Sequence, residues 1–206
     1  MRHSTDTEVR IALVRHARSS HVHAGWIDAS GFRAWREAYE AAAIRDDERV
    51  PAPLQQLASR GGIVLSSDAP RALASARMLA GGREVVVSPL LRELDLEGPA
   101  LGGLRLPLGA WAAAVGGRTL LRTLQGRYPS AEEAARIEGA ASWIEELAAQ
   151  HSLIIAVTHA MFRRRLAARL AQADWQPVPG RRSLQPWSAW LFTAARTGAP
   201  ILTRGS

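Results

Sequence analysis

Short apolar runs alternate with longer stretches of helical spacing along this chain, and that alternation predicts an α/β protein. The apolar runs are rich in β-branched residues and predict strands at 11–14, 63–66, 85–88, 153–158 and 187–193. A continuous run such as LIIAV is typical of a parallel strand that is buried on both faces. We therefore expect a three-layer α/β/α sandwich with a mostly parallel central sheet.

The stretches between these runs carry apolar residues at helical spacing and predict helices at 32–43, 53–59, 70–79, 131–149 and 161–172. Two of the helices have a recognisable start. Ser130 and Glu133 have the spacing of a capping box, and Asp68 with Pro70 is expected to open the helix that follows. The stretch 98–128 is rich in Gly, Leu and Trp without a clear period, which suggests a lid or a side insertion.

A chain of 206 residues with 47% hydrophobic and 22% charged residues suits one folded domain spanning 1–206. Because the sequence has no Cys, disulfide frameworks, thiolate nucleophiles and Cys-based zinc sites are excluded. The first ten residues, MRHSTDTEVR, are polar where a secretory signal needs an apolar run, and no later stretch has the length of a membrane span. The sequence thus predicts a cytoplasmic protein without a membrane partner.

The formal charge of +7 comes entirely from Arg, since the sequence contains no Lys. A guanidinium group suits phosphate and carboxylate ligands because it donates two parallel hydrogen bonds. The Arg residues are spread along the chain without interleaved aromatics, so we expect no specific nucleic-acid partner. His21 and His23 alternate as metal ligands can, but no carboxylate stands at a fixed spacing from them. We assign no metal and no cofactor.

Reactive side chains follow four of the apolar runs. Arg15 and His16 come directly after the first strand, Arg71 lies on the first turn of a helix, Glu93 follows the third strand, and His159 follows LIIAVT. In an open α/β sheet, ligands bind at the carboxyl ends of the strands. We therefore expect these five side chains to meet at one edge of the sheet.

The same four segments resemble the motifs of the histidine phosphatase superfamily, also called phosphoglycerate-mutase-like. Residues 13–17 are similar to L-x-R-H-G, residues 66–76 to S-S-x-x-x-R-A-x-x-T-A, residues 91–93 to L-R-E, and 158–163 to the S-H-G-G region. The stretch FRAWREAYEAAAI resembles the small bacterial phosphatases of this superfamily. The resemblance covers nearly the whole chain and implies a metal-independent phosphatase acting on a small phosphorylated substrate.

The resemblance also implies a role for each motif residue. His16 is the expected nucleophile, which carries the phosphoryl group as a covalent phosphohistidine. Arg15, Arg71 and His159 are expected to surround the phosphoryl oxygens together with His16. Glu93 is the expected general acid, which requires a raised pKa because an exposed Glu is ionised at pH 7.

Side chains near these motifs are open to a functional or a structural interpretation. Ser19 is expected to add a hydrogen bond to phosphate, and Arg163 is a weaker candidate for the same task. Asp95 and Glu97 lie close to Glu93 and are alternatives to it as the acid.

The sequence departs from the superfamily pattern where Ala17, Ala160 and Met161 replace glycines. A Cβ at such a position lowers affinity or activity if the backbone needs positive φ or a close approach to phosphate. This motivates one alternative, a binder of phosphorylated ligands without turnover. A phosphomutase is a second alternative. A nucleic-acid-binding protein, suggested only by the net charge, is a third.

The tryptophans of this chain are expected to pack mostly in the core or in the insertion. Trp26 and Trp111 carry a second interpretation, in which they flank the leaving group of the substrate.

Overall fold

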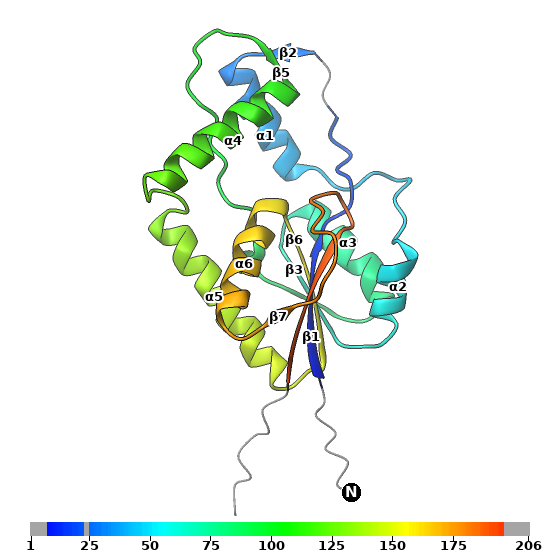
Figure 1. The fold of residues 1–206 in the computed structure, drawn as a ribbon. Helices are drawn as coiled ribbons and strands as arrows, with labels where there is room; N and C mark the ends of the chain where they lie inside the picture. Colours follow the sequence, from blue (N-terminus) through cyan, green and yellow to red (C-terminus); the bar gives the residue numbers. More distant parts are fainter. Residues whose placement is uncertain (1–7, 23–24, 196–206) are drawn as a thin grey trace, which may run out of the picture.

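The computed structural model describes residues 8–22 and 25–195, which build a six-stranded sheet with helices on both faces (Figure 1). The strand order is β4-β3-β6-β1-β8-β7, and β4, β3, β6 and β1 are parallel neighbours. β8 pairs antiparallel with β1, and β7 pairs antiparallel with β8. The strands are β1 (Glu8–Arg15), β3 (Ile63–Ser66), β4 (Val85–Val87), β6 (Leu153–Thr158), β7 (Gln176–Pro177) and β8 (Ala189–Ala195).

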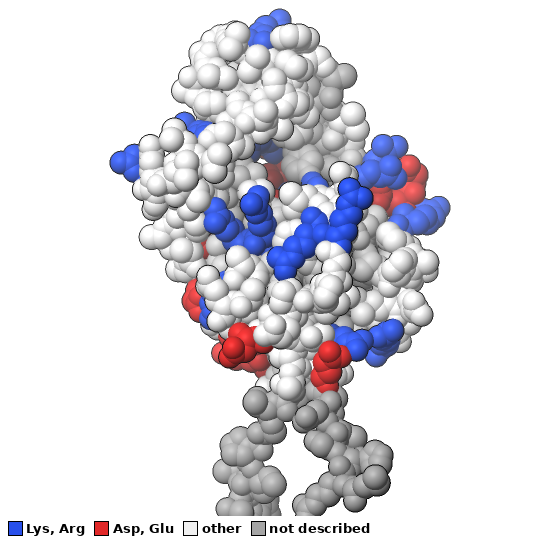
Figure 2. Space-filling model, viewed as in Figure 1, with Lys and Arg blue, Asp and Glu red and all other residues white. Residues whose placement is uncertain are grey.

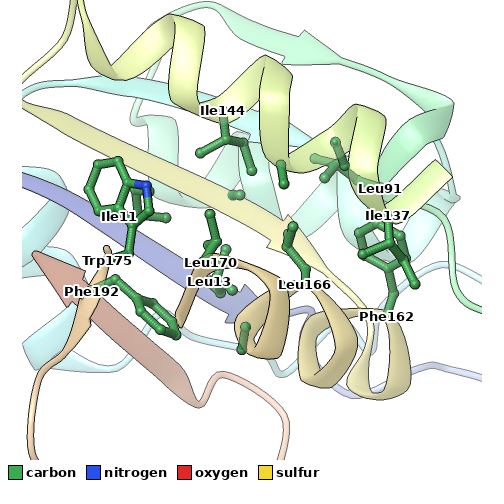
Figure 3. Packing of buried hydrophobic residues seen from close by; sticks show 14 of the residues in the cluster. Ile11, Leu13, Leu91, Ile137, Ile144, Phe162, Leu166, Leu170, Trp175 and Phe192 are labelled. Atoms are coloured by element: carbon green, nitrogen blue, oxygen red, sulfur yellow. The ribbon is translucent and has the colours of Figure 1, made fainter. Parts of the chain in front are cut away.

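Helices cover the two faces of this sheet in pairs. α2 (Ala52–Ala58) and α3 (Pro70–Ala80) lie on one face, and α5 (Ala131–Ala148) and α6 (Ala160–Gln172) lie on the other. Successive residues of β1 point into the two cores in turn. Ile11 and Leu13 point toward α5 and α6 (Figure 3), and Ala12 and Val14 belong to the core under α2 and α3. The predicted three-layer α/β/α sandwich with a mostly parallel sheet is confirmed.

A smaller layer lies over the carboxyl ends of the parallel strands (Figure 1). It consists of α1 (Ala29–Ala41), α4 (Leu108–Leu124) and the two-stranded ribbon of β2 (Trp26–Ile27) and β5 (Leu106–Pro107), and we call these elements the cap. Its own buried cluster is Phe32, Trp111 and Val115. Whether residues 98–128 move as a lid stays a prediction.

The predicted strands and helices are all present, with ends that differ by one to three residues in most cases. The pattern missed α4 because Leu120, Leu121 and Leu124 are exposed on it, so its apolar residues do not follow one face. The last strand begins at Ala189 and not at 187, because Trp187 has a φ of 60° and belongs to the preceding loop. Within residues 8–22 and 25–195, no helix combines the length and the apolarity that crossing a bilayer requires.

The two predicted helix starts have different outcomes. Ser130 and Glu133 form the complete capping box at the start of α5. The expectation that Asp68 opens α3 is wrong, because Ala69 is the N-cap residue and makes no side-chain cap. Asp68 instead accepts a hydrogen bond of 2.7 Å from Arg92 Nε, which ties α3 to the segment that follows the 3₁₀ turn η1 (Pro89–Leu91). Pro70 stands at the start of α3 as expected.

Candidate active site

The two motif histidines lie side by side because the strands that carry them are paired. Arg15 at the end of β1 is in register with Thr158 at the end of β6, so the next residues along the two strands are neighbours. The backbone N–H of His16 donates to Thr158 O at 3.0 Å, and the ring centroids of His16 and His159 are 5.1 Å apart. The parallel pairing of two strands thus brings together residues 143 positions apart in the sequence.

His16 has one ring nitrogen held by the backbone and the other turned toward the site. Nδ1–H donates to Ala17 O at 2.6 Å, which leaves the lone pair on Nε2, and Nε2 accepts from Arg71 Nε at 3.3 Å. Burial lowers the pKa of His16 from 6.5 to about 3, and the positive charge of Arg71 adds to this effect. His16 is therefore a neutral imidazole at pH 7, and its unprotonated Nε2 accepts the hydrogen bond from Arg71.

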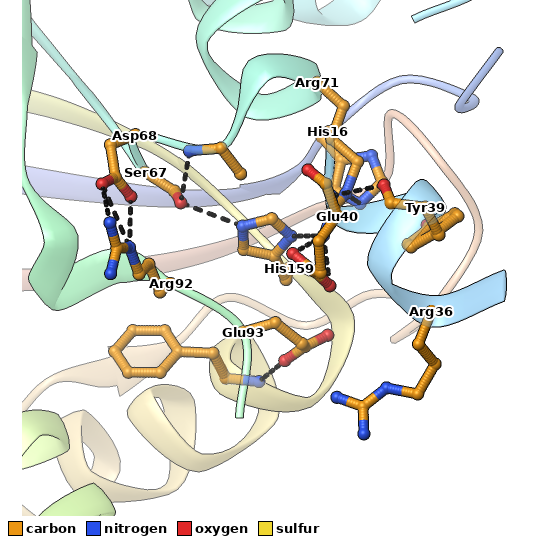
Figure 4. A network of polar contacts seen from close by, with 12 residues as sticks. His16, Arg36, Tyr39, Glu40, Ser67, Asp68, Arg71, Arg92, Glu93 and His159 are labelled. Atoms are coloured by element: carbon orange, nitrogen blue, oxygen red, sulfur yellow. Dashed lines mark hydrogen bonds and ion pairs between the residues drawn. The ribbon is translucent and has the colours of Figure 1, made fainter. Parts of the chain in front are cut away.

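Arg71 connects the two histidines to the cap, and all of its N–H groups have partners (Figure 4). Besides the contact of Nε with His16, one terminal nitrogen (NH1) donates to Tyr39 O at 3.0 Å and to Glu40 O at 3.2 Å. The other (NH2) lies 3.1 Å from His159 Nδ1 and 3.0 Å from a carboxylate oxygen of Glu40. The ring of Tyr39 lies over the guanidinium, 4.5 Å from its centroid. The end of α1 thus holds a buried Arg in one orientation.

His159 is buried and hydrogen-bonded through both ring nitrogens. Its Nε2 lies 3.0 Å from Ser67 Oγ, on the side away from Arg71 (Figure 4). Burial lowers the pKa of His159 well below 6.5, and the neighbouring His16 and Arg71 lower it further. Because the Arg71 guanidinium can only donate, Nδ1 of His159 is the acceptor, and the neutral ring carries its proton on Nε2, which donates to Ser67 Oγ.

Glu93 lies against the first turn of α6, where it accepts three backbone hydrogen bonds. The donors are Leu94 N at 3.0 Å, Met161 N at 3.2 Å and Phe162 N at 2.7 Å. Burial raises the pKa of this carboxyl, while the three N–H groups act in the opposite direction. The net effect is a raised pKa for Glu93, which is what a general acid requires.

The two alternatives to Glu93 are on the surface. Asp95 pairs with Arg36 at 3.0 Å, and Glu97 pairs with Arg118 at 2.9 Å. Their carboxyl groups are more than half exposed. Neither has the buried surroundings that raise the pKa of Glu93.

The remaining predicted residues lie at different distances from this centre. Arg15 lines the same cavity as His16, and its Nε is buried without a hydrogen-bond partner in the described part of the chain. Ser19 does not line that cavity, and its hydroxyl accepts from His21 N at 3.1 Å. A phosphate contact of Ser19 stays a prediction. Arg163 donates to Ser183 O at 2.8 Å and to Ser188, so it holds the loop before β8 and does not face the cavity.

A cavity of about 360 Å³ opens between the sheet edge and the cap. Its sheet side is formed by motif residues, and its cap side is largely apolar and aromatic. Among the lining residues are Arg15, His16, Arg71 and Glu93 on the sheet side and Trp35 and Tyr39 on the cap side. A second cavity of about 450 Å³ reaches His159, Glu93 and Glu40 from the side of Asp68 and Arg92. On the face shown in Figure 2, arginines gather below the hollow between cap and sheet, which favours the approach of anions.

Three residues of this centre were not expected from the sequence. Tyr39 and Glu40 come from α1, and Ser67 is the second Ser of the segment that leads to Arg71. The signal for α1 was available, because Phe32, Trp35 and Tyr39 recur at helical spacing and form one aromatic face. No comparable signal shows that the last turn of this helix would contact Arg71.

The three residues that replace glycines have ordinary backbone conformations. Outside glycine, only Asp174 and Trp187 have positive φ in the described part of the chain. Ala17 is fully buried in the core under α2 and α3, and its N–H donates to Ser75 Oγ at 2.9 Å. Ala160 and Met161 form the first turn of α6. A Cβ at these positions therefore causes no backbone strain.

The two tryptophans considered as flanks of a leaving group lie elsewhere. Trp111 is fully buried and donates from Nε1 to Ile27 O at 2.8 Å, and Trp26 is 60% exposed on β2. Trp35 contributes to the cavity wall instead. His23 lies outside the described residues, and within 8–22 and 25–195 no three His, Asp or Glu side chains gather as a metal site would require.

No protein-family model and no curated protein matches the chain. A solved structure named Mycobacterial hydrolase 2 is 19% identical, covers 94% of this chain and 84% of its own, and superposes with a TM-score of 0.60. The chain has the phosphoglycerate-mutase-like fold. The resemblance seen in the four motifs is thereby confirmed at the level of the fold.

Two other solved structures that match the chain superpose with TM-scores below 0.5. One is a putative alpha-ribazole-5'-P phosphatase from Escherichia coli, 18% identical over 79% of both chains, with a TM-score of 0.47. The other is a phosphoserine phosphatase from Entamoeba histolytica in complex with 3-phosphoglyceric acid, 18% identical over 80% of both chains, with a TM-score of 0.48.

Proposed function

We propose that this protein is a metal-independent phosphomonoesterase that forms a covalent phosphohistidine on His16. The proposal rests on the protonation state and the orientation of the His16 ring. Its Nδ1–H is fixed on Ala17 O, and its pKa of about 3 leaves Nε2 unprotonated at the rim of a cavity. A neutral imidazole with a directed lone pair is the form in which histidine attacks phosphorus.

In the first half-reaction, Nε2 of His16 attacks the phosphorus atom and the bond from phosphorus to the ester oxygen breaks. The departing oxygen takes the proton of Glu93, so the alcohol leaves as a neutral molecule. Glu93 lines the same cavity as His16 and has a raised pKa, which supports this assignment.

In the second half-reaction, the carboxylate of Glu93 takes a proton from water while the water oxygen attacks phosphorus. The bond from phosphorus to Nε2 breaks, and its electron pair returns to His16. Inorganic phosphate leaves, and Glu93 is protonated again for the next cycle.

The phosphoryl oxygens need positive partners through both steps, and Arg15 and Arg71 are placed to supply them. Arg71 has no unused donor in this structure, since Nε is on His16 and NH2 is on Glu40 and His159. Substrate binding therefore requires these donors to move from the protein acceptors to phosphate oxygens. Glu40 is 49% exposed and can turn into solvent, which makes its carboxylate the partner most easily displaced.

Two alternatives differ from hydrolysis in that neither releases inorganic phosphate. A binder without turnover was motivated by Ala17, Ala160 and Met161, and their ordinary backbone conformations weaken that motive. A phosphomutase would return the phosphoryl group to another oxygen of the same substrate and release no inorganic phosphate.

The decisive experiment is hydrolysis of an aryl phosphate in the presence of EDTA by the wild type, His16→Ala and His151→Ala. We expect turnover that survives chelation, a loss of at least roughly 10⁴-fold in His16→Ala, and normal turnover in His151→Ala, which lies before β6 at the opposite end of that strand. Acid-labile phosphate trapped on the wild type and absent from His16→Ala would identify the intermediate. Full activity of His16→Ala would disprove the proposal.

The role of Glu93 is tested by Glu93→Gln, with the exposed Glu97→Gln as the matched control. We expect kcat for an alkyl phosphate to fall by about 10²–10⁴-fold, because a poor leaving group needs the proton. In the wild type, kcat should decline as pH rises through the raised pKa of Glu93, since the acid must be protonated to donate. Equal activity of Glu93→Gln and Glu97→Gln on alkyl phosphates would exclude Glu93 as the acid.

A further inference from the structure

A third cavity, of about 400 Å³, adjoins the one that contains His16. Leu96, Ala112, Val115 and Met161 line both cavities, so the two spaces share a wall beneath α4. From there the third cavity follows α4 toward Thr119 and Thr123. Ala112 and Thr123 are eleven residues apart, which corresponds to roughly 16 Å along the helix axis.

The walls of the two adjoining cavities are apolar next to the reaction centre. Phe32, Trp35 and Leu108 stand on one side, and the four shared residues continue the wall. The polar side chains of the third cavity are Thr119 and Thr123 of α4 and Arg164 and Arg165 of α6, and Arg165 donates to Thr123 Oγ1 at 3.2 Å. The apolar stretch therefore has a beginning next to the phosphate side and a defined end.

The charged side chains of the first cavity are already paired on its cap side. Arg36 donates to Leu96 O at 2.7 Å and pairs with Asp95 at 3.0 Å. Glu40 pairs with Arg71 at 3.0 Å. A leaving group that carries a carboxylate, such as that of a phosphorylated amino acid or hydroxy acid, would have to break one of these pairs and would face Glu40.

Size leads to the same conclusion. Cavities that bind small molecules measure about 300–1,000 Å³ and enclose most of the ligand surface. The first and third cavities, with about 360 and 400 Å³, each fall in this range. A phosphate ester of a two- or three-carbon alcohol would leave the space under α4 unused.

We propose that the substrate is a phosphate monoester of an extended apolar alcohol, whose uncharged chain lies along α4 between Ala112 and Thr123. This inference rests on the proposed phosphatase function and names the substrate class of the same site. The phosphate is held at the sheet edge, and the chain contacts Met161, Val115 and the other apolar residues of the shared wall.

The test compares kcat/KM for ethyl, butyl, hexyl and octyl phosphate, below the concentrations at which they form micelles. These alcohols have nearly the same acidity, so the chemical step is held constant and only the binding of the chain varies. We expect kcat/KM to rise by up to about fourfold per methylene that reaches the wall, the factor that corresponds to about 0.8 kcal/mol. O-phosphoserine and glycerol 3-phosphate should be poorer substrates than hexyl phosphate.

Ala112→Asp places a carboxylate in the shared wall, and Ala113→Asp places one on the next residue of α4, which lines neither cavity. Both alanines are exposed residues of the same helix, which makes Ala113→Asp the matched control for Ala112→Asp. We expect the octyl-to-ethyl ratio of kcat/KM to fall at least tenfold in Ala112→Asp and to stay unchanged in Ala113→Asp.

Different results would contradict the substrate class and the phosphatase function. A flat dependence on chain length, a preference for O-phosphoserine, or equal ratios in the two variants would overturn the substrate class while leaving the phosphatase intact. Absence of turnover with every ester, or turnover that survives His16→Ala, would instead overturn the proposed function.

Discussion

The cap and the edge of the central sheet face each other across one cavity, but they are held in place differently. On the sheet edge, His16, Arg71 and His159 are at most 2% exposed, and each has hydrogen bonds to at least two partners. In the part of the chain that the structure describes, the buried cluster of the cap is Phe32, Trp111 and Val115, with partly buried apolar residues packed against it, and three leucines near the end of α4 are exposed. We therefore expect the sheet edge to be the more rigid of the two.

This difference matches what each region is proposed to do. Attack on phosphorus requires fixed geometry, which strand ends inside a packed sandwich supply. The leaving group requires surface that can adapt, and regions with few buried apolar contacts open at low free energy. Arg71 is where the two regions meet, because a helix of the sandwich carries it and the end of α1 holds it.

Among the changes that test this comparison, the largest effect is expected where the two regions meet. Arg71→Lys keeps the charge but cannot contact His16, His159 and the acceptors of α1 at the same time, since Lys has no planar fork. We expect kcat/KM for an aryl phosphate to fall by about 10³-fold. The exposed Arg77→Lys on the same helix is the control and should match the wild type. Equal activity of both variants would show that the cap does not act through Arg71.

An intermediate effect is expected inside the cap. Trp111→Ala removes the centre of its buried cluster, a type of change that costs about 3–5 kcal/mol. We expect the amides of α1 and α4 to exchange hydrogen at least about a hundredfold faster, while those of β1 and β6 keep their protection. Trp26→Ala, at an exposed position of the same cap, should change neither set. Uniformly faster exchange would mean that cap and sheet unfold as one unit.

The smallest effect is expected from the carboxylate that pairs with Arg71. Glu40→Gln keeps an acceptor for the guanidinium but removes a negative charge that competes with phosphate. Because Glu40 is half exposed, solvent screens this charge, and we expect the inhibition constant of inorganic phosphate to fall by only about two- to fivefold. The exposed Glu37→Gln on the same helix is the control. A higher inhibition constant would mean that Glu40 mainly positions Arg71.

The ends of the parallel strands were the most predictable part of the site. LIIAVT and IALV are continuous apolar runs, so their burial as neighbouring strands follows from local composition. Once they are parallel neighbours, Arg15, His16 and His159 must lie at one edge. The start of α5 was equally predictable, since Ser130 and Glu133 satisfy each other within four residues.

The cap was not predictable by the same means. α4 has apolar residues around its whole surface, which hides the helical period. Asp68 has the chemistry of a helix cap, yet it pairs with Arg92, a residue 24 positions away. Trp111 was read as a possible flank of the leaving group, but its ring stacks on Phe32 at a centroid distance of 4.8 Å, inside the cluster of the cap. The partners of Asp68 and Trp111 are residues that lie far from them in the sequence.

The sequence by itself determined the layers of the sandwich and the edge at which the motif residues stand. The period of apolar residues and the chemistry of turns and caps act over a few neighbouring positions, so a linear pattern contains them. Only the tertiary structure decided that Tyr39 and Glu40 hold Arg71, that Ser67 meets His159, and that α4 adds an apolar space beside His16. Such contacts arise when separate elements pack together, and their free energy depends on shape and burial that no single segment defines.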